Sequence, residues 1–322
     1  MVMEDLERRK VEAMRILRNK NYEVGDFLGN GAFGVVYKCR KSDGTLVAAK
    51  VTFGLWDSAQ VLEEVKAAEE LRSMKPFDWK RIESEFGFLS GKLERLKKKS
   101  SSYNKYLNKP VYVGSDTVEG EQIAIFEAPL ADDSLFGTVD LGKANEFATL
   151  KKIARQTLKA LKILHDHDRL HLDIKPDNIL KITSEKGKDR FQLADFGLVT
   201  PALGNDGTYK LDTAAIGDQY YKAPEIRSRS AAKVTLNELK AVDIYAVGIT
   251  LFQLYCEANK FNGPTCNACF EMLEEKSHLI DTLRWLPDDG KNFLKLVSKM
   301  ISLDPKQRPT AVQALADSGL SK

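Results

Sequence analysis

The chain has 322 residues, of which 43% are hydrophobic and 30% are charged, with 21 glycines and 10 prolines. This composition excludes disordered, collagen-like and disulfide-stapled small proteins, and the length suffices for about two domains. The 49 basic and 46 acidic side chains leave a formal net charge of +3, so binding of nucleic acid or another polyanion by the whole molecule is not expected.

Cysteine usage and the apolar segments favour a reducing environment. The four cysteines, Cys39, Cys256, Cys266 and Cys269, are too few for a disulfide framework in a chain of this length. The charged first ten residues have no apolar stretch behind them, so no signal peptide is expected. The apolar run 242–256 is shorter than the ~20 residues that a bilayer crossing needs. We therefore expect an intracellular protein, cytoplasmic or nuclear, without a transmembrane segment.

The first part of the chain changes from a helical to a strand pattern. Residues 3–19 place apolar side chains near helical spacing among charges, which predicts an amphipathic helix. Residues 22–51 contain three strand patterns separated by glycine-rich turns, and the segments 110–117 and 121–128 predict two more strands. A helix is expected over 59–74. These elements predict a five-stranded antiparallel sheet with one main helix.

A basic insert, residues 72–109, lies between that helix and the fourth strand. It contains eleven Lys or Arg and four acidic residues, which gives a net charge of +7. We interpret the insert as a solvated helical excursion. Docking of a partner, contact with an acidic lipid surface or nucleic acid, and nuclear targeting are the alternatives.

After residue 135 the pattern is mainly helical. Residues 148–165 and 243–256 predict two long helices, the second apolar on nearly all sides, and residues 171–182 and 190–198 predict short strands. The fold class is therefore α+β. Three parts are expected: an N-terminal helical extension (1–21), a sheet-containing lobe with the basic insert (22–130) and a mainly helical lobe (131–322).

Gly29, Gly31 and Gly34 form a Gly-x-Gly-x-x-Gly pattern, which also fits a dinucleotide-binding turn or an ordinary hairpin. In dinucleotide-binding proteins this turn opens a helix, whereas here a strand pattern follows Gly34. The glycines are therefore predicted to lie in a hairpin. Such a loop can bring backbone N–H groups close to phosphate oxygens, because few side chains obstruct it.

Further motifs follow in a fixed order. They are Ala48-Ala49-Lys50, His171-Leu172-Asp173-Ile174-Lys175-Pro176-Asp177-Asn178, Asp195-Phe196-Gly197, Ala223-Pro224-Glu225, Asp243 with Gly248, and Arg308. With these motifs and the glycine loop, the chain resembles the eukaryotic-type protein kinase family over about residues 22–317. The resemblance implies a bilobal fold that binds ATP and Mg²⁺ between a small sheet lobe and a large helical lobe and phosphorylates protein substrates.

The resemblance assigns roles to five polar side chains. Lys50 is expected on the α- and β-phosphates and Lys175 near the γ-phosphate, while Asp173 accepts the proton of the substrate hydroxyl. Asn178 and Asp195 are expected to hold Mg²⁺, for which amide and carboxylate oxygens are suitable ligands.

The ion-pair partner of Lys50 is expected on the helix 59–74. Glu64 fits best, because the residues that follow it reproduce the usual run of the family, and Glu63 and Glu69 remain open. The chain departs from the family at Ala68, where a large apolar residue is usual.

For adenine and ribose the resemblance implies two sets of residues. Val36 and Ala48 are expected to form the roof over adenine and Leu180 the floor, although ordinary core packing would explain the same apolar residues. Asp133 or Ser134 is the expected partner of the ribose.

The segment after Phe126, the expected gatekeeper, resembles the hinge of the Pim kinases because it contains Pro129. Most family members donate a backbone N–H to adenine from this position, and proline has none. We therefore expect one hinge hydrogen bond, accepted by the Glu127 carbonyl, instead of two.

Two departures from the family pattern bear on regulation and on the acceptor. Leu172 replaces an arginine that clamps a phosphorylated activation loop in most members, so we expect activity without this phosphorylation. Asp218 replaces a threonine of serine/threonine kinases, and an aspartate there can pair with Lys175 but would also lie near the like charge of Asp173. Both departures resemble the Wee and Myt kinases, which keeps a tyrosine or dual-specificity acceptor open. The run Lys175-Pro176-Asp177-Asn178 is the usual serine/threonine form, which we favour.

Glu225 and Arg308 are expected to form a buried, structural ion pair. Cys266-x-x-Cys269 has no second Cys or His pair at ligand spacing, which disfavours a zinc site. Two other function classes are alternatives. A pseudokinase scaffold is disfavoured by the retained catalytic residues, and a small-molecule phosphotransferase by the Ala223-Pro224-Glu225 segment.

Overall fold

The computed structural model describes residues 2–31, 34–53, 103–118, 121–136, 146–196, 209–212, 217–227, 231–258 and 288–320. Of these, residues 2–53 and 108–132 belong to an N-terminal unit, and residues 103–107 and those from 133 onward belong to a C-terminal unit. The predicted helix 59–74 with Glu64, most of the basic insert, and the Cys266-Cys269 pair lie outside the described residues.

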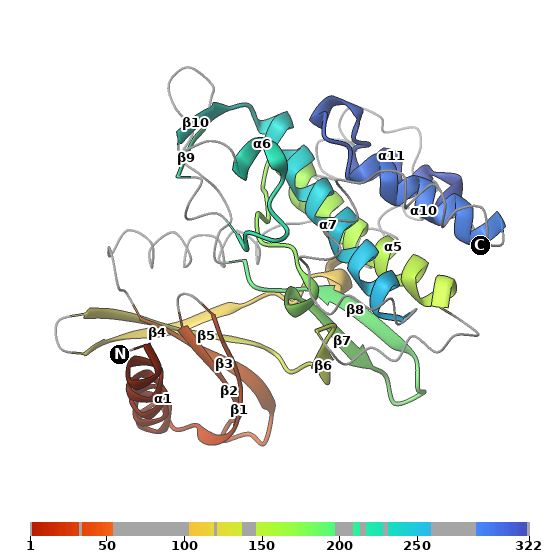
Figure 1. Cartoon of the computed structure of the whole chain (residues 1–322). Helices are drawn as coiled ribbons and strands as arrows, with labels where there is room; N and C mark the ends of the chain where they lie inside the picture. Colours follow the sequence, from red (N-terminus) through yellow and green to blue (C-terminus); the bar gives the residue numbers. More distant parts are fainter. Residues whose placement is uncertain are drawn as a thin grey trace, which may run out of the picture. The chain divides into compact units, whose positions relative to one another are not determined.

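The N-terminal unit is built on a five-stranded antiparallel sheet with strand order β1-β2-β3-β5-β4 (Figure 1). The strands are β1 (Glu23–Gly31), β2 (Gly34–Arg40), β3 (Leu46–Phe53), β4 (Val111–Val118) and β5 (Glu121–Pro129). This confirms the five strands predicted from the alternating pattern. Burial alternates along β2 and β3, since successive side chains of a strand point to opposite faces.

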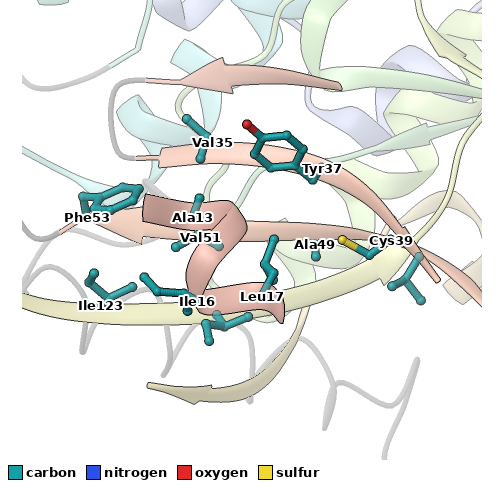
Figure 2. Close-up of a cluster of buried hydrophobic side chains, with 12 residues drawn as sticks. Ala13, Ile16, Leu17, Val35, Tyr37, Cys39, Ala49, Val51, Phe53 and Ile123 are labelled. Carbon is teal, nitrogen blue, oxygen red and sulfur yellow. The ribbon is translucent and has the colours of Figure 1, made fainter. Parts of the chain in front are cut away.

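Helix α1 (Val2–Asn19) covers one face of this sheet. Its side chains Ala13, Ile16 and Leu17 are fully buried and belong to one apolar cluster with residues of the sheet (Figure 2). The sheet contributes Val35, Tyr37, Cys39, Val47, Ala49, Val51, Phe53, Ile123 and Ile125. Burying a Leu or Ile side chain contributes roughly 1.5–3 kcal/mol. The predicted N-terminal helix is therefore an integral layer of this unit.

The C-terminal unit is mainly helical. It contains α5 (Glu146–Asp166), α6 (Pro224–Arg227), α7 (Leu236–Ala258), α10 (Asp288–Met300) and α11 (Ala311–Ala316), and α5 packs beside α7 (Figure 1). Among the described residues, α7 is the one helix long and apolar enough to cross a membrane, but 89% of its most apolar window is buried within the fold. It is a core helix, as its apolar character on all sides predicts.

Short strands and 3-10 turns complete the C-terminal unit. One sheet contains β6 (Asp133–Ser134), β7 (Ile179–Thr183) and β8 (Asp189–Leu193), and another pairs β9 (Tyr209–Asp212) with β10 (Ala231–Val234). The 3-10 turns are η1 (Tyr103–Tyr106), η2 (Pro176–Asn178), η3 (Pro305–Gln307) and η4 (Ser318–Leu320).

The end of the basic insert differs from the boundary that the sequence predicts. The sequence pattern assigns residues 103–107 to the sheet lobe, but they lie in the C-terminal unit. The reason is pairing with β8: Leu107 forms a parallel bridge with Leu193, and Gln192 Nε2 donates to the Lys105 carbonyl at 2.8 Å.

The predicted ion pair of Glu225 and Arg308 is present in the C-terminal unit. Arg308 Nη1 and Nη2 donate to the two carboxylate oxygens of Glu225 at 2.6 and 2.8 Å. The Arg308 side chain is 0% exposed, and its guanidinium carbon lies 4.8 Å from the ring centre of Tyr245. Backbone carbonyls of Ser302 and Ala241 accept further hydrogen bonds from it, so the buried charge is well supplied with acceptors.

Candidate active site

The glycine loop is a hairpin between β1 and β2, as its sequence context predicts. Gly29 lies opposite Val36, and Gly31 lies opposite Gly34, where β2 begins. A Cβ atom at Gly34 would approach the Val51 carbonyl oxygen to 2.3 Å, so the neighbouring strand β3 requires glycine there. Because a strand follows Gly34, the dinucleotide-binding interpretation is excluded.

One face of the N-terminal sheet collects the residues predicted for ATP. Lys50 lies opposite Val36 on β2 and opposite Phe126 on β5, so the three side chains share a face. Ala48, two residues before Lys50, lies on the same face. Val36, Ala48 and Lys50 are only half-buried, while Phe126 is 1% exposed. The sheet thus presents an accessible apolar surface beside a lysine, on the face opposite α1.

The hinge end of β5 is held by side chains that no sequence motif indicates. The Asn108 amide donates to the Pro129 carbonyl at 3.0 Å, and Phe126 contacts Tyr112 edge-on with ring centres 5.8 Å apart. The Glu127 carboxylate accepts from Lys41 Nζ at 3.0 Å and from the Tyr22 hydroxyl. The single adenine hydrogen bond at the Glu127 carbonyl stays a prediction.

In the C-terminal unit, the Asp173 carboxylate is surrounded by donors. Asn178 Nδ2 donates to Asp173 Oδ2 at 2.9 Å and to its carbonyl at 2.7 Å. Lys175 Nζ lies 3.2 Å from Asp173 Oδ2, and the Asp218 N–H donates to Oδ1 at 3.1 Å. These contacts fix the carboxylate in one orientation. Lys175 thus forms an ion pair with Asp173, and the charge of Asp218 also acts on Lys175.

The Asp218 carboxylate caps a turn, because its Oδ1 accepts from the Tyr220 N–H at 2.9 Å. Burial alone would lower the pKa of Lys175, but the charge and hydrogen bond of Asp173 and the charges of Asp218 and Asp177 raise it overall. Lys175 is therefore firmly protonated.

The backbone next to Asp173 is hydrogen-bonded to a side chain of the core helix α7. Asp243, which is 0% exposed, accepts from the N–H groups of His171 and Leu172 at 2.9 and 2.7 Å. Its Oδ2 also lies 2.9 Å from His165 Nε2. These bonds hold Leu172 in the left-handed region, at φ +62°, in which few non-glycine residues occur. Asp243 is thus a positioning residue for the catalytic loop.

The predicted metal ligands Asn178 and Asp195 are brought together by the pairing of β7 with β8. Ile179 lies opposite Leu193, and the Ala194 N–H donates to the Asn178 carbonyl at 2.9 Å. His171 Nε2 bonds the Ala194 carbonyl at 2.9 Å, and its ring packs edge-on against Phe196. These contacts fix the backbone on both sides of Asp195, whose φ is +58°.

The donor set fits Mg²⁺. Both hydrogen bonds of the Asn178 amide nitrogen go to Asp173, which leaves the amide oxygen as the ligand atom. Mg²⁺ typically binds one or two protein oxygens together with water and substrate phosphates. No cluster of three or more His, Cys, Asp or Glu ligands occurs among the residues that the structure describes. The site therefore suits a cation that arrives with a phosphate ligand.

The residues predicted for ribose and for the adenine floor are adjacent. β6 pairs with β7 so that Ser134 lies opposite Leu180 and Asp133 opposite Lys181. Ser134 and Leu180 therefore share a face, which favours Ser134 over Asp133 as the partner of a ribose above that floor.

Gly217 allows a close contact between the turn 217–221 and the loop 171–175 that carries Asp173. Its φ is +53°, and a Cβ atom there would approach the Leu172 carbonyl oxygen to 2.4 Å. We expect Gly217→Ala to push the Asp218 N–H away from Asp173 and to lower kcat at least about tenfold, the loss expected for a hydrogen bond to a charged group. Steady-state kinetics tests this.

Gly187→Ala is the matched control. Gly187 has a similar φ of +68°, but no atom of the described residues lies within 4 Å of the place that a Cβ atom would take. The substitution should cost about 1 kcal/mol of stability without changing kcat. Equal kcat values for the two variants would contradict the role given to Gly217.

Comparison with known proteins agrees with this geometry. A family model described as the protein kinase domain matches residues 22–318. Calcium-dependent protein kinase 19 of Arabidopsis thaliana is 25% identical over 297 residues, covering 92% of this chain and 47% of the relative. Mitogen-activated protein kinase 8 of Oryza sativa subsp. japonica is 26% identical over 340 residues, covering 94% and 52%.

A third relative is the membrane-associated tyrosine- and threonine-specific cdc2-inhibitory kinase of Drosophila melanogaster. It is 29% identical over 301 residues, covering 90% of this chain and 45% of the relative. The chain spans about half the length of these curated relatives. Because the kinase-domain match covers most of its length, the chain belongs to the protein kinase family.

Proposed function

We propose that this kinase transfers the γ-phosphoryl group of ATP to serine and threonine hydroxyl groups of proteins and that it requires Mg²⁺. The observation that carries the proposal is the oriented Asp173 carboxylate, held by Asn178, Lys175 and the Asp218 N–H. Asp173 also lines a small cavity beside the core helix α7. The cavity is completed by Leu172, Ile174, Gly217, Asp218, Tyr221, Lys222, Val242, Asp243 and Ala246.

The proposed reaction needs one proton acceptor and several cations. Asp173 accepts the proton of the acceptor hydroxyl while the hydroxyl oxygen bonds the γ-phosphorus, and the bond from that phosphorus to the β–γ bridging oxygen breaks to release ADP. Lys175 and Lys50 offset the negative charge on the phosphates. Mg²⁺, held by Asn178 and Asp195 when bound, neutralises charge on the phosphate oxygens.

The acceptor class is tested with labelled ATP, Mg²⁺ and an equimolar mixture of peptides that carry Ser, Thr or Tyr. We expect phosphoserine and phosphothreonine, and Asp173→Asn and Lys50→Met should abolish the label. Phosphotyrosine as the main product would instead support the Wee- and Myt-like alternative, which Leu172 and Asp218 favour. Equal background labelling by the wild type, Asp173→Asn and Lys50→Met would support a pseudokinase scaffold.

Activity should not require phosphorylation of the activation segment, the part of the chain between the Asp195 motif and Glu225. Leu172 replaces the arginine that would bind the phosphate, and it is only 6% exposed. Backbone pairing of β9 with β10, in register from Tyr209 opposite Val234 to Asp212 opposite Ala231, ties this segment to the chain that follows it. Phosphatase-treated enzyme, checked by intact mass, should keep its full kcat. Loss of activity that returns on rephosphorylation would refute this prediction.

Docking of an acidic segment of a protein partner is the alternative to a purely solvated basic insert 72–109. Its net charge of +7 supports this, and its end is anchored on β8 through Lys105 and Leu107. Binding of an acidic peptide should weaken steeply with salt, because surface charges are screened over about 8 Å at physiological ionic strength.

A further inference from the structure

The end of α1 fixes the position of Tyr22. The Asn21 N–H donates to the Arg18 carbonyl at 3.0 Å, and the Tyr22 N–H reaches back to the Leu17 carbonyl at 3.1 Å. Asn21 has a φ of +64°, so the helix ends in a Schellman motif with asparagine in the left-handed position. Since Leu17 is fully buried against the sheet, Tyr22 is attached to a rigid point of the fold.

Glu127 points to the same side of the sheet as α1. It lies opposite Ala49, whose side chain belongs to the cluster beneath α1, while its neighbour Phe126 lies opposite Lys50 on the other face. The Glu127 side chain is only 13% exposed. Its charge also acts on the core: the pKa of the Cys39 thiol is raised to about 11, mainly by burial and further by the negative charge of Glu127.

Two donors satisfy the Glu127 carboxylate. The Tyr22 hydroxyl donates to Oε1, and Lys41 Nζ donates to Oε2 at 3.0 Å. Burial, together with the hydrogen bond and charge of Glu127, raises the pKa of Tyr22, so the phenol keeps its proton. Hydrogen bonds to a charged group are stronger than those between neutral groups, and a carboxylate this buried depends on them.

These contacts lie near the end of β5. β5 ends two residues after Glu127, at Pro129, which offers no N–H to a neighbouring strand or to a ligand. Side-chain hydrogen bonds add to the backbone pairing here: Asn108 donates to the Pro129 carbonyl, and Tyr22 and Lys41 donate to the Glu127 carboxylate.

We propose that Tyr22 and Lys41 are positioning residues for nucleotide binding, which hold the Glu127 backbone where its carbonyl can accept the adenine amino group. The inference rests on the proposed function, because it assigns ATP to the face that carries Lys50. It makes the segment before the glycine loop part of the nucleotide site. It also gives the Glu127 side chain a role on the face that ATP does not contact.

The test compares Tyr22→Phe with Tyr37→Phe in the full chain. Tyr37 is a matched control, because its hydroxyl also joins the sheet to α1, through the Lys10 carbonyl at 3.3 Å, but it does not contact Glu127. We expect Tyr22→Phe to raise KM for ATP and Kd for a fluorescent ATP analogue about three- to tenfold, less than the full loss of a charged hydrogen bond because Lys41 still holds the Glu127 carboxylate. The kcat at saturating ATP should change less than about twofold, because the bond does not touch the reacting groups. Tyr37→Phe should leave both nucleotide constants unchanged.

Lys41→Met provides a second, more exposed variant that should shift nucleotide affinity in the same direction. A purely structural role would lower Tm equally in both tyrosine variants and leave KM for ATP unchanged, and this result would overturn the inference. If the wild-type chain itself fails to bind the ATP analogue, the proposed function fails first. If it binds and Tyr22→Phe binds equally well, only the positioning role fails.

Discussion

Asp173→Asn is expected to lower kcat by about 10²–10⁴-fold, the range typical of a general base, while KM for ATP changes little. Asparagine has nearly the same shape and keeps one oxygen acceptor, which can serve either Lys175 or the Asp218 N–H but not both. It cannot take up the proton of the acceptor hydroxyl. The loss should therefore appear in the chemical step, and initial rates over a range of ATP concentrations will show it.

Asp166→Asn is the control for this experiment. Asp166 lies at the end of α5, is 41% exposed and pairs with Lys162 one helical turn away. Its replacement should leave kcat and KM unchanged, since exposed pairs of this kind contribute only about 0.3–0.5 kcal/mol to stability. If Asp173→Asn kept more than about a tenth of the wild-type kcat, Asp173 would not be the base.

Glu225→Ala is expected to destabilise the protein by about 3–5 kcal/mol, because it leaves a buried guanidinium without its counter-charge. Arg308 has no exposed side-chain surface, and two of its hydrogen bonds go to Glu225. The pair connects α6, at the end of the activation segment, with the loop around η3. Unfolding in denaturant, followed by fluorescence, measures the change.

Lys299→Ala supplies the comparison for an ion pair of similar length. Lys299 Nζ lies 2.8 Å from Asp317 Oδ2, but the lysine side chain is 57% exposed. Its removal should cost no more than about 1 kcal/mol. Similar losses of stability in Glu225→Ala and Lys299→Ala would show that burial does not determine how much the Glu225–Arg308 pair contributes to the free energy of unfolding.

The sequence predicts those parts of the site that depend on local pattern. Alternation along the strands places Val36 and Ala48 on one face, and the strand after Gly34 identifies the glycine loop as a hairpin. The apolar character of α7 on all sides predicts a core helix. Each of these features follows from side-chain spacing within one element.

Contacts between distant polar side chains were not predictable. Nothing in the local pattern around Tyr22, Lys41 or Asn108 indicates that they hold the end of β5, because isolated polar residues of this kind are usually solvated. The attachment of residues 103–107 to β8 is unpredictable for a similar reason. It depends on a single backbone bridge and one glutamine, neither of which has a periodic signature.

The proposed function depends most on Lys50 and Asp195 both acting on bound ATP. The most direct measurement is the affinity for ATP, with and without Mg²⁺, of the wild type, Lys50→Met, Asp195→Asn and the double variant. We predict that each single substitution weakens binding of Mg²⁺-ATP about 10- to 100-fold, as expected for lost charged contacts, and that the double variant falls short of the product of the two effects. Wild-type affinity in both single variants, with the same dependence on Mg²⁺, would contradict the account.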